Sequence, residues 1–362
     1  MYMLEANLLQ GKKLLLIDKD TKQTNDRTWC FWQKEPNMFE SIVYKKWENL
    51  QVYAPNVNKL ENIHPYVYKM IRGIDFYNYC LQTIQQHPNI EIITGTIQSI
   101  TSNSNGATVV VNQREYTATY CFSSILLQEP LLGKNQHYLL QHFKGQIIET
   151  DTPVFDSNTA TYMDFTVPQT HGTTFGYVLP FTATKALVEY TLFTKNVLTT
   201  EQYDEGLKSY ITNNLKINTY KVVETEQGII PMTDYNFKKS DDNIVYIGTA
   251  GGNTRGSTGY TFNYIQKNSK AIVDALIHNI HPAKAKTVMS ATAKYYDSIL
   301  LTVLANNYVA GQNVFANIFK KVRLKKVLSF LDDDNNFAND IQIIWSQPKW
   351  PFMKAALKKI LN

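Results

Sequence analysis

One glycine-rich segment limits the possible folds of this chain more than any other feature. In "NIVYIGTAGGNTRGSTGYTFNYI" (243–265) an apolar strand pattern leads into a loop, and a helical pattern then starts near Ser257 or Thr258. The segment holds Gly248, Gly251, Gly252, Gly256 and Gly259. Glycine lets a ligand approach the backbone, and a helix N-terminus offers unpaired N–H groups at its positive end. This order favours a site for a phosphate or for the anionic edge of a reduced flavin over a plain turn.

A second feature of dinucleotide-binding folds is the strand pattern "KLLLID", which ends at Asp18. In such folds the second strand ends in an acid that accepts hydrogen bonds from the adenosine ribose. The usual partner is a glycine turn about 20 residues upstream, but only Gly11 precedes Asp18 here. We therefore expect the chain to begin inside a dinucleotide-binding unit, without its first strand and glycine turn.

The remaining patterns predict an α/β frame with a strand-rich insertion. Residues 74–87 read as a helix that stops before Pro88, and residues 139–194 read as a block of strands. Residues 199–215 are helical, and most of the chain after Thr258 follows a helical pattern. Two domains are therefore expected to interleave along the chain.

One acidic residue lies inside an apolar strand pattern, "ALVEYTLF" (186–193). Alternation places Leu187, Glu189 and Thr191 on one face of this strand and Val188 and Tyr190 on the other. An ionised carboxylate rarely points into an apolar layer without a partner. Glu189 is therefore either a solvated residue of an edge strand or a buried acid. Burial would raise its pKa enough for proton donation near neutral pH.

Composition excludes several classes of protein. With 362 residues, 44% of them hydrophobic, the chain can build a substantial core. Its three cysteines lack the spacing of a metal site, so none is expected. No stretch approaches the ~20 apolar residues of a membrane-spanning helix.

Basic residues gather near the C-terminus. Residues 270–362 carry 13 Lys and Arg against 6 Asp and Glu, a net charge of +7, whereas the whole chain carries +5. The surplus lies in "IFKKVRLKKVLSFL" (318–331) and "KWPFMKAALKKILN" (349–362). Such segments can lie on anionic lipid or can be solvated helix faces. Nucleic acid is not an expected partner, because no binding-module motif surrounds these residues.

Several motifs together resemble the lycopene cyclases of carotenoid biosynthesis, of the bacterial flavoprotein type. The resemblance runs in order over nearly the whole chain. It is carried by "DKD" (18–20), "NDRTWCFW" (25–32), "YKMIRGIDFY" (68–77), "MDF" (163–165), "YVLPF" (177–181), "ALVEYTLF" (186–193), "GIIPM" (228–232) and "IGTAGGNTRGSTGYTF" (247–262). The family has a FAD-binding fold related to flavin hydroxylases and reductases. It converts the linear ends of lycopene into β-ionone rings without net oxidation or reduction.

The resemblance implies a site for reduced FAD, with NAD(P)H as a possible reductant. Asp18 would bind the adenosine ribose, and Arg27 would reach the adenosine or pyrophosphate region. Arg72 would contact the cofactor or the other domain. The flavin would be bordered by Gly248, Gly251, Gly252, Ser257, Thr258, Gly259 and Tyr260. Without the upstream glycine turn, we expect FAD binding to be weak.

The resemblance also implies the catalytic residues. Glu189 matches the acid of the motif that initiates cyclisation, whereas Tyr190 stands where that motif often has a second acid. Asp164 in "MDF" is a secondary acid or base candidate. Aromatic residues of the strand-rich block would line the polyene channel, and Trp29, Phe31 and Trp32 are expected to pack in the core.

The expected fold is α/β: a FAD/NAD(P)-binding Rossmann-like fold of the flavin hydroxylase and reductase type, with an inserted β-rich substrate domain and C-terminal helices. Residues 1–60, 66–135 and 220–280 would form the FAD-binding domain, 136–219 the substrate domain and 281–362 a membrane-facing helical region. The expected partners are lycopene or a related acyclic carotene and the surface of the cytoplasmic membrane, with the oligomeric state left open. A FAD-dependent hydroxylase or reductase of another polyprenoid and an inactive truncated cyclase are the alternatives.

Overall fold

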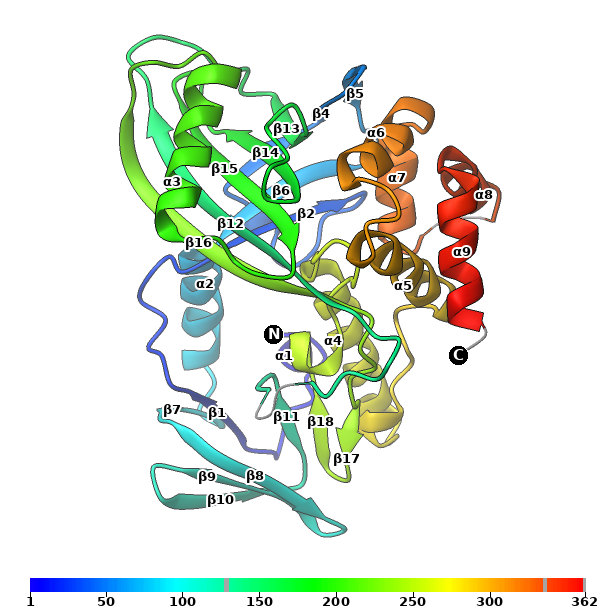
Figure 1. Ribbon diagram of the computed structural model, residues 1–362. Helices are drawn as coiled ribbons and strands as arrows, with labels where there is room; N and C mark the ends of the chain where they lie inside the picture. Colours follow the sequence, from blue (N-terminus) through cyan, green and yellow to red (C-terminus); the bar gives the residue numbers. More distant parts are fainter. Residues whose placement is uncertain (127–129, 335–336, 361–362) are drawn as a thin grey trace.

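The computed structural model describes residues 1–126, 130–334 and 337–360, and its largest element is a seven-stranded sheet (Figure 1). All neighbouring strands are antiparallel except β13 and β4, which are parallel. In spatial order the strands are β16 (Lys221–Thr233), β12 (Tyr138–Glu149), β15 (Lys185–Thr194), β14 (Thr173–Pro180), β13 (Thr159–Asp164), β4 (Asn49–Ala54) and β5 (Val57–Asn62).

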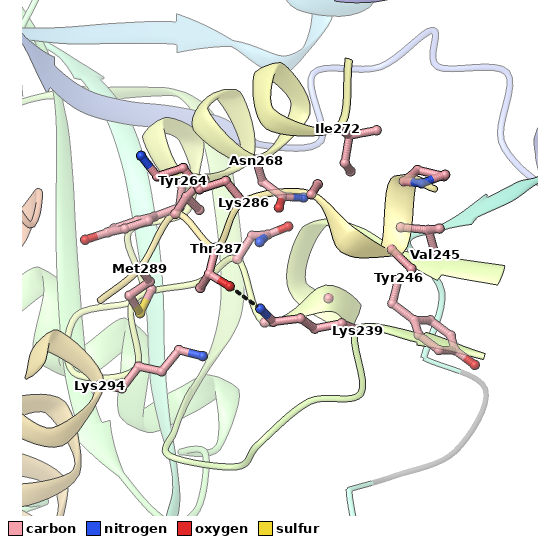
Figure 2. Close-up of a pocket in the computed structure, with 17 residues that line it drawn as sticks. Lys239, Val245, Tyr246, Tyr264, Asn268, Ile272, Lys286, Thr287, Met289 and Lys294 are labelled. Carbon is pink, nitrogen blue, oxygen red and sulfur yellow. Dashed lines mark hydrogen bonds between the residues drawn. The ribbon is translucent and has the colours of Figure 1, made fainter. Parts of the chain in front are cut away.

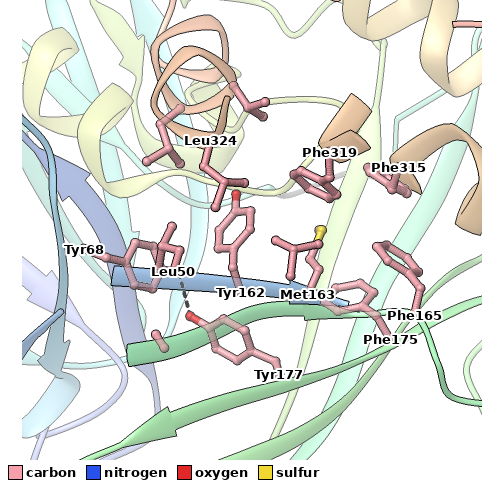
Figure 3. Packing of buried hydrophobic residues seen from close by; sticks show 14 of the residues in the cluster. Leu50, Tyr68, Tyr162, Met163, Phe165, Phe175, Tyr177, Phe315, Phe319 and Leu324 are labelled. Carbon is pink, nitrogen blue, oxygen red and sulfur yellow. Dashed lines mark hydrogen bonds between the residues drawn. The ribbon is translucent and has the colours of Figure 1, made fainter. Parts of the chain in front are cut away.

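The two faces of this sheet are covered by different helices. Val188, Tyr190 and Leu192 pack with residues of α3 (Thr200–Ser209) and of the π-helix η2 (Tyr210–Asn214). Phe165 and Phe175 pack on the other face against α6 (Gly311–Lys321), as Figure 3 shows. The core of β15 is therefore buried on both sides, which explains its nearly continuous apolar sequence.

Smaller sheets complete the frame. Figure 1 shows the large sheet and the parallel strand pairs at opposite ends of the molecule, with α2 and α4 between them. The pairs are β1 (Leu14–Asp18) with β7 (Ile90–Thr94), and β11 (Cys121–Ser123) with β18 (Ile244–Tyr246), which also pairs with β17 (Ser240–Asp241). The other three-stranded sheets are β2 (Thr28–Gln33), β6 (Val67–Arg72) and β3 (Lys45–Trp47), and β8 (Ile97–Asn103), β9 (Gly106–Val111) and β10 (Arg114–Ala118).

Helices cover the rest of the described chain. The α-helices not yet given are α1 (Tyr2–Glu5), α2 (Gly73–Gln85), α4 (Phe262–Ile277), α5 (Ala291–Ala305), α7 (Leu324–Leu331), α8 (Phe337–Ser346) and α9 (Lys349–Ile360). Short 3-10 turns are η1 (Glu40–Ile42), η3 (Gly248–Gly251) and η4 (Pro282–Lys284). The part of the chain described here contains no helix long and apolar enough to cross a membrane.

The structure differs from the sequence-based expectations in three places. The large sheet extends beyond residues 136–219, because β4, β5 and β16 join it. α4 begins at Phe262 rather than near Ser257 or Thr258, because the preceding residues fold as turns. The segment 318–331 is divided between α6 and α7, and its apolar side chains, including Phe319 and Leu324, lie in the core.

A buried ion pair fixes the glycine-rich segment to the C-terminal helices. Arg255 is fully buried, and its Nε donates to Asp297 Oδ1 on α5 at 2.9 Å. The Ser257 hydroxyl donates to the same oxygen at 2.7 Å, and Arg255 Nη1 donates to the Tyr264 hydroxyl at 3.0 Å. The position of the loop before α4 therefore depends on a charge on another helix.

Asp297→Ala should destabilise the protein by about 3–5 kcal/mol, because it leaves the Arg255 guanidinium buried without its counter-charge. Denaturant unfolding would measure this loss. Asp274→Ala on α4 is the control, because the Asp274 side chain is 74% exposed. An Asp297→Ala protein as stable as the Asp274→Ala protein would contradict the argument.

Candidate active site

A cavity of about 650 Å³ lies where the large sheet meets the glycine-rich segment. The sheet contributes Tyr177, Glu189, Thr191 and Glu226 to its wall. Residues 26–30, at and before the start of β2, form a second part, and residues 248–249 and 258–262 form a third. Its size lies within the range of small-molecule sites in proteins.

Glu189 faces this cavity from the middle of β15. Its side chain is only 8% exposed, and it lies opposite Tyr177 on β14 and Gly145 on β12. Burial raises the pKa of Glu189 well above its usual range, and the neighbouring Glu226 carboxyl raises this pKa further. Of the two alternatives for this residue, the structure therefore matches the buried acid, whose surroundings favour the neutral form.

Glu226 on β16 is a second acid in the cavity that sequence reasoning missed. Its Oε2 accepts a hydrogen bond from the Thr28 hydroxyl at 2.7 Å, and its side chain is hydrogen-bonded to Glu189. Burial raises the pKa of Glu226 as well. The only sequence signal was its position two residues before Gly228, which places both residues on one face of β16.

Four tyrosines form the aromatic wall of the cavity, three of which, Tyr68, Tyr162 and Tyr177, lie close together in Figure 3. The Tyr68 hydroxyl is 2.6 Å from that of Tyr177 and 3.1 Å from that of Tyr260. The Tyr162 and Tyr260 rings stack with centroids 6.4 Å apart. Burial raises the pKa of all four phenols, so they stay neutral. Their ring faces can attract a positive charge in the cavity.

Another part of the cavity lining has the features of a cofactor site. Of the residues expected there, Arg27, Gly248, Thr258, Gly259 and Tyr260 line the cavity, and the first turn of α4 reaches it through Phe262 and Ile265. Several lining side chains carry buried polar atoms with no hydrogen-bond partner among the described residues. These atoms are Trp29 Nε1, Gln141 Oε1, Thr258 Oγ1 and Glu226 Oε1. Unpartnered buried polar atoms that face a cavity fit a polar ligand such as a flavin ring.

Asp18 and Arg72, also expected at the cofactor, lie outside the cavity lining. Asp18 ends β1 as expected, and its carboxylate accepts from the Asp20 N–H at 2.9 Å and lies 3.4 Å from Lys22 Nζ. Arg72 donates twice to Asp75, at 2.6 and 2.8 Å, and its guanidinium lies 4.3 Å from the centre of the Tyr44 ring. The Arg72 guanidinium therefore already has partners within the protein.

Gly251 and Gly252 border a different and much smaller pocket, of about 50 Å³, shown in Figure 2. A side chain at Gly251 would approach the Tyr246 carbonyl oxygen to 2.3 Å, and Gly252 has a φ of +71°. The tight turn of the backbone therefore requires these glycines. Ser257, also expected at the cofactor, is 3% exposed, and its hydroxyl donates a hydrogen bond to Asp297.

Asp164, the secondary acid candidate, lies at the end of β13 and does not line the cavity. Its Oδ1 accepts from the Thr166 N–H at 2.9 Å and from the Thr166 hydroxyl at 2.6 Å. Its Oδ2 accepts from the Tyr210 hydroxyl at 3.1 Å. Through these three hydrogen bonds, Asp164 has a structural role: it joins the end of β13 to η2.

Glu189→Gln should change how stability depends on pH. The folded protein holds the Glu189 proton at a higher pH than the unfolded chain, because burial raises its pKa. Neutral Glu189 therefore contributes fully to the free energy of unfolding at pH values below its pKa in the unfolded chain. This contribution is lost as the pH rises through its pKa in the folded protein. As pH rises above the usual glutamate pKa, the parent should lose up to about 1.4 kcal/mol of unfolding free energy per pH unit relative to Glu189→Gln.

Urea unfolding at several pH values measures this difference. Glu149→Gln on β12 is the control, because the Glu149 side chain is 42% exposed and its pKa is lowered by a hydrogen bond with Lys185. Its unfolding free energy should stay at a constant offset from the parent over this range. Parallel curves for the parent and Glu189→Gln would show that Glu189 is ionised in the folded protein.

Comparison with known proteins identifies the family and the fold. The family model described as lycopene cyclase protein matches residues 5–357. Among proteins with curated descriptions, none matches this sequence.

Three solved structures with similar folds are distant from this chain in sequence. A flavoprotein/dehydrogenase from Cytophaga hutchinsonii has a TM-score of 0.65 at 10% identity, over 99% of this chain and 96% of that one. A geranylgeranyl bacteriochlorophyll reductase-like protein from Thermoplasma acidophilum has a TM-score of 0.58 at 10% identity, over 95% and 92%. The p-nitrophenol 4-monooxygenase from Pseudomonas putida has a TM-score of 0.55 at 10% identity, over 96% and 91%. The expected fold class, a Rossmann-like flavoprotein fold with a β-rich domain, is confirmed.

Proposed function

Because the chain belongs to the lycopene cyclase family, we propose that it is a lycopene β-cyclase, which closes the linear ends of lycopene or a related acyclic carotene into β-ionone rings. The observation that carries the proposal is Glu189, a buried carboxylic acid in a cavity with an aromatic wall. A polyene has no polar group, so its cyclisation must begin with protonation of an alkene. A neutral acid shielded from water is the group required for this step.

The reaction follows from the position of this acid. Glu189 gives its proton to C2 of the terminal alkene, which leaves a cation at C1. The C5=C6 electron pair forms the C1–C6 bond, and the positive charge moves to C5. Loss of the C6 proton gives the C5=C6 double bond of the β ring, so no electrons enter or leave. The transient positive charge is stabilised by the faces of the aromatic rings of Tyr68, Tyr162 and Tyr177.

The cofactor end of the cavity is suited to FAD. Thr258, Gly259 and Tyr260 would border the isoalloxazine, Arg27 would reach the pyrophosphate or adenosine, and Asp18 would bind the ribose. When bound in its reduced, anionic form, the cofactor supplies negative charge that stabilises a nearby carbocation. Gly259 has a φ of +72°, and a Cβ atom there would lie 2.9 Å from Gln141 Oε1 and from Ile230 Cγ2, so the bend of the backbone before α4 requires glycine at this position.

Glu189→Gln should abolish cyclisation in a lycopene-accumulating host. Glutamine keeps the size and hydrogen bonding of the side chain but has no acidic proton. General acid catalysis typically contributes about 10²–10⁴-fold, so pigment chromatography should show lycopene with little cyclic carotene. Glu149→Gln should produce cyclic carotene like the parent. Near-parental product from Glu189→Gln would remove Glu189 from the mechanism.

Cofactor turnover separates the cyclase from the redox alternatives. A cyclase needs reductant only to keep its flavin reduced, so NAD(P)H consumption should not rise with the amount of product. Stoichiometric use of NAD(P)H or oxygen would instead indicate a hydroxylase or reductase of another polyprenoid.

We also propose that helices α8 and α9 rest on the cytoplasmic membrane. Phe337, Trp345 and Trp350 are 75%, 68% and 73% exposed, and Lys349 Nζ lies 5.1 Å from the Trp345 ring centre. Exposed aromatic rings beside lysines are typical of protein surfaces that bind anionic lipid. Figure 1 shows α8 and α9 at the outer edge of the molecule.

The contacts of individual lysines narrow the region that was expected, from charge alone, to contact lipid. Within 318–331, Lys321 donates to the Ser346 carbonyl at 2.9 Å and Lys326 donates to Gln342 Oε1 at 2.7 Å, so both attach α6 and α7 to α8. Within the segment 349–362, residues 349–360 form α9, and residues 361–362 lie outside the described part of the chain. Lipid contact is therefore proposed for α8 and α9 rather than for α6 and α7.

The double variant Trp345→Ser, Trp350→Ser should bind phosphatidylserine-containing vesicles at least about tenfold more weakly than the parent, because two rings no longer bury apolar area in lipid. Co-sedimentation at physiological salt measures this. Leu60→Ser on β5 is the control, because Leu60 is 59% exposed but lies outside the helical region. A parent that does not sediment with vesicles would refute the proposed membrane contact.

A further inference from the structure

We propose that Glu189 and Glu226 act as one proton-sharing pair held together across Gly145, in which Glu226 accepts the proton released at the end of each ring closure. This inference rests on the proposed cyclase function and adds a second acid–base residue to it.

The pair is built by the register of three adjacent strands. β12 lies between β15 and β16, and Gly145 is opposite Glu189 on one side and opposite Glu226 on the other. Strands separated by one intervening strand are about 9.6 Å apart, so the two side chains can meet only by leaning over β12. A Cβ atom at position 145 would lie 2.9 Å from Glu189 Cγ and 3.2 Å from Glu226 Cγ. The absence of a side chain at Gly145 therefore makes the contact possible.

The charges around the pair require a shared proton. Among the described residues, neither Glu189 nor Glu226 forms an ion pair, and Arg27, the nearby cation of the cavity wall, is paired with Asp26 at 2.7 Å. Two buried carboxyl groups in contact, without a cation, cannot both be ionised. One proton between them removes this repulsion and forms a charge-assisted hydrogen bond.

The hydrogen bonds indicate which residue holds the proton. Thr28 donates to Glu226 Oε2 at 2.7 Å, whereas the hydroxyl of Thr191 lies 3.4 Å from Glu189 Oε2. The stronger donor stabilises a carboxylate on Glu226. Glu226 Oε1 is buried and has no donor among the described hydroxyl, amide and cationic groups, so it is free to accept from a protonated Glu189. The resting pair is therefore neutral Glu189 and anionic Glu226.

Other titratable groups near the pair leave this assignment unchanged. The Cys30 thiol on β2 and the Tyr177 phenol on β14 are hydrogen-bonded to each other, and burial raises the pKa of both. Although burial opposes ionisation of Asp26, hydrogen bonds from Arg27 and Tyr77 hold the pKa of Asp26 below its usual value. The Glu224 carboxyl on β16 accepts from Asn25 Nδ2 at 2.9 Å.

This arrangement closes the proton balance of the reaction. Glu189 loses its proton to C2, and the C6–H bond later breaks so that its electron pair forms the ring double bond. The C6 proton goes to Glu226, which passes it through the hydrogen bond to Glu189. Each ring closure thus returns the pair to its starting state without a proton from water. The Glu226 carboxylate also places negative charge near the cation.

The test is cyclisation by Glu226→Gln across a range of pH. We expect the rate to fall about 10²-fold or more, as for loss of a general base. The alkaline limb of the pH–rate profile should move to lower pH, because Glu189 loses the neighbouring negative charge that raises its pKa. Gly145→Ala should also lower the rate, because the added methyl group separates the carboxyls. Glu224→Gln, two residues away on β16, should keep the parental rate and profile.

An infrared measurement on the parent tests the pair without any substrate. A band of a neutral carboxylic acid should be present at pH 7, and it should titrate at lower pH in Glu226→Gln. A parent without this band, or Glu226→Gln with the rate and pH profile of the parent, would overturn the inference. If the parent shows the band but forms no cyclic carotene, the proposed function fails while the shared proton stands.

Discussion

The burial of polar side chains at the junction between the large sheet and the glycine-rich segment is the condition on which the rest of this structure depends. Burial of Glu189 at this junction raises its pKa, because its charged form would be desolvated. The same condition requires every buried cation to have a counter-charge, as Arg255 has in Asp297. Each buried polar group in the wall of a cavity that can protonate an alkene therefore needs a hydrogen-bond or ion-pair partner. Without a partner, such a group would destabilise the folded protein.

Strand alternation and local motifs were sufficient to predict the strand face that carries Glu189, the strands that end at Asp18 and before Gly248, and the class of fold. They left the burial of Glu189 open, and the strand that ends at Asp18 is only partly buried. They failed where the outcome depends on long-range pairing. Glu226 becomes important only because β16 pairs with β12 in one register. Likewise, nothing in the local pattern of 49–62 shows that β4 pairs with β13 about one hundred residues later in the chain.

Other misses have local physical causes. The start of α4 was expected too early because the glycine-rich loop returns on itself, with the Arg255 N–H donating to the Tyr260 carbonyl at 2.9 Å. Asp164 resembled a catalytic acid in sequence, but Thr166 and Tyr210 satisfy its carboxylate. Charge counting located a basic C-terminal region without separating the lysines that hold helices together from those beside exposed tryptophans.

The irregularity in the pairing of β12 with β16 has a consequence for how this protein can change over evolution. Between Ile147 and Ile148 the register shifts, so that Ile147 faces Glu224 while Ile148 faces Val222. Such a bulge absorbs one residue of mismatch between neighbouring strands. The end of the sheet beyond it, around Glu149 and Lys221, can therefore gain or lose residues in its connections while the strand positions opposite Gly145 stay aligned.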